Sequence, residues 1–292
     1  MSGYHHLAPA LAACGRDGFT GALRVTGTPG GTVHFRNGLV VAAESSGAPG
    51  PEALLLRSGR ISGEQWAELV RESGGAHWPA AELVTHGYAG DVQLRVVCVM
   101  ALHDAVFAIC AGSVEDCRRL ADTEPVAPLP VGEPAGQVLQ DTTRKLAALE
   151  ALDHAVHPER ERLLAAADPD GPFTPLQRDL LGHADGRSTA RDLAFRTGRS
   201  VYAVTVEVAR MLGEGLLERV VAPEPVRIHT PPDGHGVRPR TPPPPGPPPT
   251  PHGPDVLPRR QPGASGIAEV LEPEDSGTSW KWFFRLRNGT AR

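Results

Sequence analysis

The chain has 292 residues, a hydrophobic content of 40% and a net charge of −5. This length favours two domains with connecting segments. The 33 glycines and 30 prolines exceed what a compact fold needs, so we expect part of the chain to be disordered. The charge excludes a strongly basic nucleic-acid coat protein, and four cysteines without a C-x-x-C pair exclude a disulfide scaffold. We expect a cytoplasmic protein whose thiols are reduced.

Residues 19–45 have the pattern of an antiparallel β meander. Apolar side chains alternate with polar or small ones, and a Thr-Pro-Gly-Gly turn separates the first two runs. Asn37 and Gly38 lie between two further apolar runs, where a type I′ turn requires positive φ at both positions. The segment therefore predicts a small sheet near the start of the fold.

Short helices are expected to follow this sheet. Pro51 suits the first position of a helix, and Ser62 with Gln65 forms a capping box ahead of another. A third short helix is expected over residues 79–86. The meander and these helices together predict an α+β domain over residues 1–122.

Residues 92–111 form the most apolar helix candidate of the chain. Its length suits a membrane span, but four polar or charged residues interrupt it: Gln93, Arg95, His103 and Asp104. We therefore expect a helix buried in protein, with no membrane-spanning segment.

A connecting region is expected over residues 123–170. Its first part carries Pro125, Pro128, Pro130 and Pro134, which is typical of a linker. Residues 137–157 then predict an amphipathic connector helix, for which a short coiled coil is the alternative.

A second domain is expected over residues 171–229. Thr174, Thr189 and Ser200 each begin a predicted helix. Residues 216–222 predict a strand, and a Pro-Glu-Pro turn precedes residues 226–228. Three short capped helices followed by a small hairpin are typical of a winged helix. The fold class expected for the whole chain is α+β: a small antiparallel β meander packed with helices, a helical connector, a winged-helix-like domain and a disordered tail.

The end of the chain predicts no packed core. Residues 230–279 lack apolar periodicity, and residues 230–254 alone hold 12 prolines, which indicates a disordered proline-rich linker. Residues 280–292 combine aromatic and basic side chains. We expect this tail motif to bind a protein partner or to make weak contact with a membrane surface. The alternative is that it folds back on the chain's own domain. The predicted partner-binding residues are Trp280, Lys281, Trp282, Phe283, Phe284, Arg285 and Arg287.

Residues 18–25 give a phenylalanine, a Ser/Thr and a Gly that lead into a strand, and residues 33–43 give a Phe-x-x-Gly hairpin that ends in alanine. These two segments resemble the PATAN-type domain of bacterial signalling proteins. The resemblance covers about the first 120 residues. It implies a non-catalytic interaction module whose partners include small-GTPase or two-component signalling components. We therefore expect an adaptor or regulator that acts through protein–protein contacts at the exposed face of the strand–helix module and at the tail.

A DNA-binding transcriptional regulator is the alternative. The third helix of a winged helix lies in the major groove and presents basic or amide side chains there, but this chain offers one arginine in that helix. The acidic residues of the domain nearly balance its arginines, so we expect any DNA binding to be weak. The residues available for it are Arg187, Arg191, Arg196, Arg199 and Arg210.

No motif in the sequence predicts catalysis. A P-loop, a G-x-S-x-G elbow and a Rossmann glycine run are all missing, and the histidines are scattered. Glu44 and Glu52 lie at a turn and a helix start, where negative charge is favoured in any case. We expect no enzyme, no cofactor and no metal site, and the sequence leaves the oligomeric state open.

Overall fold

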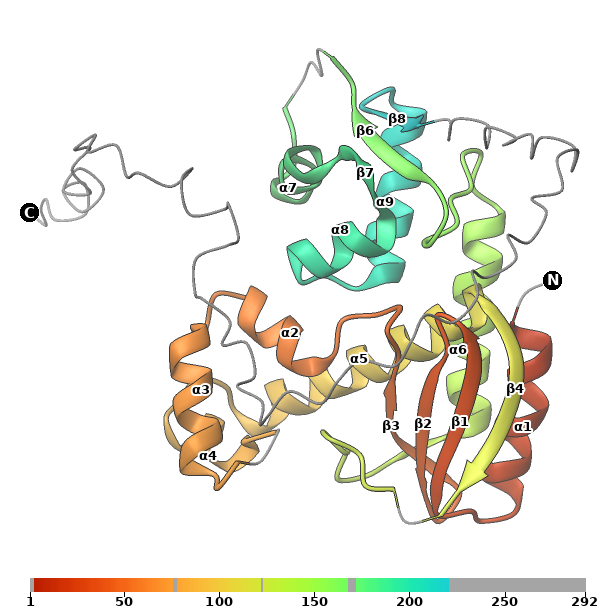
Figure 1. Ribbon diagram of the computed structural model, residues 1–292, viewed down its shortest axis with the longest axis vertical. Helices are drawn as coiled ribbons and strands as arrows, with labels where there is room; N and C mark the ends of the chain where they lie inside the picture. The colour runs from red at the N-terminus through yellow and green to blue at the C-terminus, as the bar shows by residue number, and fades with distance from the viewer. Residues whose placement is uncertain (1–2, 76–77, 122, 168–171, 221–292) are drawn as a thin grey trace, which may run out of the picture. The chain divides into compact units, whose positions relative to one another are not determined.

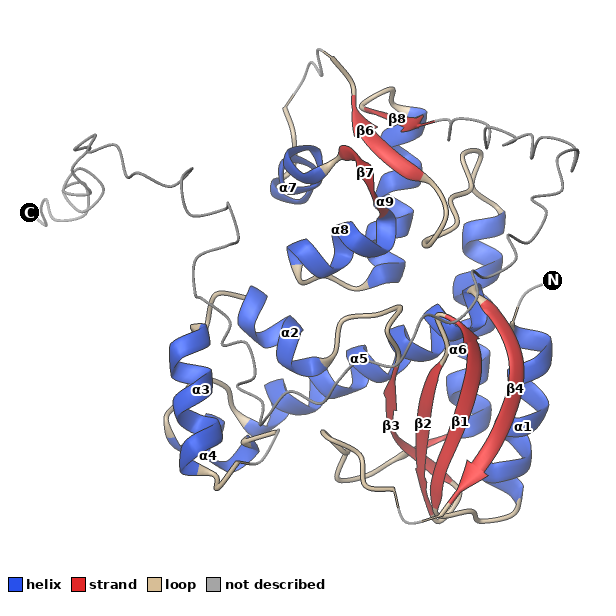
Figure 2. Cartoon of the chain, in the orientation of Figure 1, coloured by secondary structure: helices blue, strands red, loops and turns tan. Residues whose placement is uncertain are grey.

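The computed structural model describes residues 3–75, 78–121, 123–167 and 172–220 of the chain (Figure 1). These residues form a mixed α+β structure with two antiparallel sheets, as the sequence predicts (Figure 2). The predicted proline-rich linker and the aromatic–basic tail lie outside the described residues.

The first three strands form the predicted meander. β1 (Gly21–Thr28) pairs with β2 (Gly31–Arg36), and β2 pairs with β3 (Leu39–Glu44), all antiparallel. At the turn between β2 and β3, φ is 51° at Asn37 and 77° at Gly38. Positive φ at both residues is what a type I′ turn requires, so the predicted hairpin is confirmed.

Two later strands complete this sheet, and the sequence analysis did not predict either. β4 (Ser113–Leu120) and β5 (Glu133–Pro134) give the order β4-β1-β2-β3-β5. Both are outer strands. β4 is rich in exposed charged residues, and β5 has only two residues, so neither shows the apolar alternation of a half-buried strand.

Three helices pack together against this sheet and build the main core: α1 (Tyr4–Arg16), α5 (Asp91–Ala111) and α6 (Ala135–Glu150). Leu7 and Leu11 of α1 are 0% exposed. The sequence analysis did not predict α1. It expected α6 to run to residue 157, whereas the helix ends at Glu150.

A second, smaller core lies among α2 (Pro51–Arg57), α3 (Gly63–Glu72) and α4 (Ala80–Thr85), beside the first half of α5. The predicted capping box is present, because the side chain of Ser62 accepts from the Gln65 amide and the Gln65 side chain accepts from the Ser62 amide. The buried residues of this core are Leu55, Ile61, Trp66, Leu69, Leu83, Ala89 and Leu94.

The proline-containing segment that precedes α6 is packed rather than solvated. Leu129 is 1% exposed, and its amide donates to the Val41 carbonyl of β3 at 2.8 Å. Ala127 is also buried. The prolines interrupt regular structure in this segment, as expected of a linker. The apolar residues between them nevertheless pack beside β3, so the segment contributes to the main core.

The second sheet differs from the expected hairpin. β6 (Arg162–Ala165) pairs with both β7 (Asp185–Thr189) and β8 (Leu217–Val220), which gives the order β7-β6-β8. The middle strand therefore comes from the region expected to be a connector. Residues 226–228, which were expected to form the second hairpin strand, lie outside the described residues.

The three predicted helices of this region are present as α7 (Pro175–His183), α8 (Ala190–Thr197) and α9 (Val201–Gly213). All three predicted caps are confirmed, because the side chains of Thr174, Thr189 and Ser200 accept hydrogen bonds from the first turns of these helices. A turn between α8 and α9 contains Gly198, whose φ of 62° suits glycine.

Substitution of Thr189 by alanine tests one of these caps. The Thr189 hydroxyl accepts from the Asp192 amide at 3.3 Å, and alanine leaves that amide without its acceptor. We expect Thr189→Ala to lower the free energy of unfolding by about 1 kcal/mol, measured by urea denaturation. A loss below the error of the method would show that the cap does not stabilise α8.

Candidate interaction site

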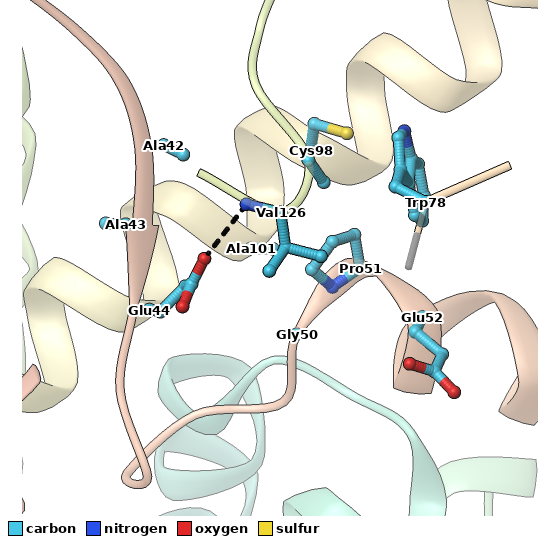
Figure 3. A pocket seen from close by; sticks show the side chains of 11 residues that line it. Ala42, Ala43, Glu44, Gly50, Pro51, Glu52, Trp78, Cys98, Ala101 and Val126 are labelled. Atoms are coloured by element: carbon cyan, nitrogen blue, oxygen red, sulfur yellow. Dashed lines mark hydrogen bonds between the residues drawn. The ribbon is translucent and has the colours of Figure 1, made fainter. Parts of the chain in front are cut away.

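An apolar pocket opens beside β3, where the chain leaves the sheet and enters α2. Its walls come from five parts of the chain: the end of β3, the start of α2, the segment that precedes α4, the middle of α5 and the segment that precedes β5 (Figure 3). Its volume is about 170 Å³. The residues that line it are Ala42, Ala43, Glu44, Gly50, Pro51, Glu52, Trp78, Cys98, Ala101, Val126 and Ala127.

The floor and walls of this pocket are small or apolar. Alanines on β3 and α5 leave space because their side chains end at Cβ. The ring of Pro51 at the start of α2 and the ring of Trp78 ahead of α4 enclose that space (Figure 3). Val126 is 47% exposed at the opening. A pocket of this composition suits an apolar group and offers little to a polar small molecule.

Cys98 contributes a thiol to the wall of the pocket. Burial raises the pKa of its thiol to about 11. The thiol is therefore protonated at neutral pH, which makes it a weak nucleophile and a weak metal ligand.

Labelling of Cys98 tests this burial. At pH 8 we expect iodoacetamide to modify Cys98 at least about a hundredfold more slowly in the folded protein than in urea, because the raised pKa removes most of the thiolate. Mass spectrometry of the labelled peptides gives both rates. Equal rates in the folded and unfolded protein would contradict the burial.

Two carboxylates stand at the opening of the pocket. The Glu44 Oε1 atom accepts a long hydrogen bond from the Val126 amide at 3.4 Å, and its side chain is 47% exposed (Figure 3). Glu52 is exposed in the first turn of α2. Among the residues that the structure describes, no basic side chain lines the pocket, so the formal charge of this lining is negative and favours a cationic neighbour.

A second apolar surface lies on the opposite side of α5. Val92, Val96 and Met100 are 77%, 51% and 47% exposed, and their spacing of four places them along one stripe of the helix. The helix is also the one among the described residues that is long and apolar enough to cross a membrane, and 61% of its apolar window is buried. Its second half is therefore the buried helix that the sequence predicts, whereas one stripe of its first half is exposed.

A polar cluster follows this stripe. The His103 Nε2 atom lies 2.7 Å from a Glu133 oxygen, and its Nδ1 atom lies 3.1 Å from an Asp141 oxygen. Lys145 pairs with the same Asp141 at 2.8 Å. The cluster joins α5 to β5 and α6. Across the described ranges, no group of three or more His, Cys, Asp or Glu side chains is arranged to hold a metal ion.

Three of the five arginines proposed for DNA contact are engaged within the protein. Arg191 donates to the Ser46 carbonyl at 2.9 Å, Arg196 lies 3.6 Å from Asp185, and Arg210 pairs with both Glu207 and Glu214. The remaining two, Arg187 and Arg199, have exposed side chains. DNA contact by the three engaged arginines would therefore compete with these interactions.

The first turn of α9 is covered by α5. Asp104 is 2% exposed, and its carboxylate accepts from the Ser200 hydroxyl at 2.8 Å, the Val201 amide at 2.6 Å and the Tyr202 amide at 3.1 Å. Recognition helices contact bases through their N-terminal residues. This arrangement disfavours the reading of DNA bases by α9. DNA binding by this region stays a prediction.

The pocket was not predicted as a unit, because its walls come from segments about 80 residues apart. Glu44 and Glu52 were noted in the sequence only as charges at a turn and a helix start. The predicted partner-binding residues Trp280 to Arg287 lie outside the described residues. Comparisons of the chain with protein-family models, curated proteins and solved structures return no match.

Proposed function

We propose that the chain is a non-catalytic signalling adaptor or regulator that acts through protein–protein contacts. The observation that carries this proposal is the apolar pocket whose described lining includes the carboxylates Glu44 and Glu52 and no basic side chain. Such a site suits one apolar side chain of a partner protein, followed or preceded by arginine or lysine.

The free energy that one buried side chain can contribute is small, which favours a pocket that forms one part of a larger interface. Full burial of one Leu- or Phe-sized side chain contributes about 1.5–3 kcal/mol, which alone gives weak binding. Charges at the rim of an interface affect partner choice and association rate more than affinity. The exposed stripe of Val92, Val96 and Met100 on α5 supplies further apolar surface for the same partner or another one. The aromatic–basic tail is expected from its sequence to bind a partner as well.

The resemblance to PATAN-type domains supports the class of partner. It implies a cytoplasmic small-GTPase or two-component signalling component, and it implies no cofactor. The Asp104 carboxylate binds the backbone amides of Val201 and Tyr202 and so holds the start of α9 against α5. Because recognition helices contact bases from that end, this arrangement favours the proposal over transcriptional regulation.

A cavity-filling substitution tests the proposal. Ala101→Leu extends an α5 side chain into the pocket, and Glu52→Lys reverses one charge at its opening. Ala148→Leu is the matched control, since Ala148 is exposed on α6. Proteins captured from native lysate by the full chain are identified and quantified for each variant.

We expect at least one partner to be held by the wild type and by Ala148→Leu, and to be reduced at least about tenfold by both pocket variants. Partners captured equally by all four chains would contradict a role for the pocket. Binding of random duplex DNA that weakens steeply with salt, with no protein partner, would support the DNA-binding alternative.

A further inference from the structure

β4 leaves one side of the first sheet open. In the described part of the chain it pairs with β1 alone, so its outer row of backbone groups faces no other strand. The Cys117 amide at the middle of this strand donates to the Asp116 side chain of β4 itself at 2.8 Å. Such an edge is a template for pairing with another strand.

The sequence of β4 is self-complementary about Cys117. On either side of this residue, Asp116 is matched by Arg118, Glu115 by Arg119 and Val114 by Leu120. When a strand pairs antiparallel with its own copy about a twofold axis, residues at equal distances from the centre face each other. Each acidic side chain would then face a basic one, and each apolar side chain an apolar one.

We propose that β4 pairs antiparallel with β4 of a second copy, centred on Cys117, and that this pairing joins the two first sheets across a homodimer. The charge pattern favours a second copy over an unrelated strand. Acidic residues of β4 face basic ones when the facing strand has the same sequence and runs in the opposite direction.

The side chains needed for this contact are accessible. Arg118 is 77% exposed, Asp116 is 48% exposed, and the two are paired within the strand at 2.6 Å. In the dimer the same two side chains can each meet the opposite charge of the facing strand. Arg119 is 41% exposed and already contacts Asp17 at 2.7 Å, so it is held beside the edge.

One irregularity limits the length of the paired segment. The register of β1 with β4 shifts between Thr26 and Gly27, where Glu115 is the additional residue of β4. Bulges of this kind bend an edge strand. The central residues Asp116 to Arg118 lie on the regular side of the shift, so they carry the contact that the test addresses.

Charge reversal provides the first test, with sedimentation velocity of the full chain over a range of concentrations as the measurement. We expect the wild type to dimerise with increasing concentration. Arg118→Asp alone and Asp116→Arg alone should each raise the dissociation constant at least about tenfold, since each places like charges opposite one another. The double variant Asp116→Arg with Arg118→Asp should restore the dimer, because the exchanged charges are again complementary.

Arg71→Asp on α3 is the matched control, since it reverses an exposed arginine away from β4 and should leave the dissociation constant unchanged. Recovery in the double variant also shows that the fold accommodates both new side chains. A wild type that stays monomeric at every concentration would overturn the proposal, as would a dimer that neither single reversal weakens.

Crosslinking provides the second test, because the proposed centre places Cys117 of one copy opposite Cys117 of the other. A short bismaleimide should link two wild-type chains and should fail to link Cys117→Ala chains. The other three cysteines are buried and serve as internal controls. Burial raises the pKa of the Cys117 thiol, so its reaction with a monofunctional maleimide is measured alongside. A dimer in sedimentation whose Cys117 reacts with the monofunctional reagent but gives no crosslink would overturn the proposed register.

Discussion

Replacement of Asp104 by alanine is expected to lower the free energy of unfolding by about 3–5 kcal/mol. The Asp104 carboxylate accepts from the hydroxyl of Ser200 and the amides of Val201 and Tyr202, and alanine leaves these donors without their acceptor. Each buried donor left unsatisfied costs about 1–3 kcal/mol. Urea denaturation followed by circular dichroism measures the loss.

Asp104→Asn is the matched control for this prediction. Asparagine keeps a carbonyl acceptor at nearly the same position but turns the second oxygen into a donor. We expect it to lose less stability than the alanine variant. If both variants unfold like the wild type, Asp104 does not hold α9 against α5.

The pH dependence of stability gives a further check on Asp104. Burial raises the pKa of this carboxyl above its ordinary value, although the hydrogen bonds from α9 act in the opposite direction. A group whose pKa is raised in the folded state contributes stability that is fully present below its unfolded pKa of about 3.9 and is lost as pH rises through the folded value.

Asp104→Asn removes this titration. We therefore expect the stability of the wild type relative to Asp104→Asn to fall as pH rises from about 4 through the raised pKa. Urea denaturation at a series of pH values measures the difference. A difference that rises with pH would mean that the folded state favours the charged carboxylate.

The second large effect is expected at Phe107. Its side chain is 0% exposed in α5, and its ring meets the Tyr202 ring of α9 edge-on with centroids 5.4 Å apart. Phe107→Ala removes the ring and leaves a cavity, so we expect a loss of about 3–5 kcal/mol in the free energy of unfolding. Phe107→Leu fills most of the space and should lose less.

The effects of Asp104→Ala and Phe107→Ala should not be additive. Both residues hold α5 against α9, so either substitution alone already weakens the contact between these helices that the other substitution also disrupts. We expect the double variant to lose less than the sum of the two single variants in urea denaturation. Strict additivity would show that the two contacts are independent.

Features set by a few neighbouring residues were predictable from the sequence. The turn at Asn37 and Gly38 and the caps at Ser62, Thr174 and Thr189 depend on side chains no more than three positions apart. Their physical causes are local, so the pattern alone identifies them.

Features set by distant partners were not predictable. β4 and β6 pair with strands far along the chain, and neither has the apolar alternation that marks a strand. Asp104 was visible as a polar residue in an apolar helix, but its function as a cap for α9 depends on packing between segments 97 residues apart. The sequence analysis used it only to argue against a membrane span.

The candidate pocket shows the same limit. Glu44 and Glu52 have ordinary local explanations at a turn and at a helix start. The fold brings them to one opening because the end of β3, the start of α2 and the middle of α5 meet there. Nothing in the spacing of these residues along the chain indicates that meeting.

The measurement that tests the proposed function most directly is site-specific photocrosslinking in the native host. A photoreactive phenylalanine analogue replaces Val126 at the opening of the pocket, and Ala148 on α6 is the matched control position. The account predicts a defined protein adduct from position 126 that is absent from position 148 and is lost when Ala101→Leu fills the pocket. The adduct should map to an apolar residue beside arginine or lysine in the partner. Identical adducts from both positions, or an adduct that Ala101→Leu does not reduce, would contradict the account.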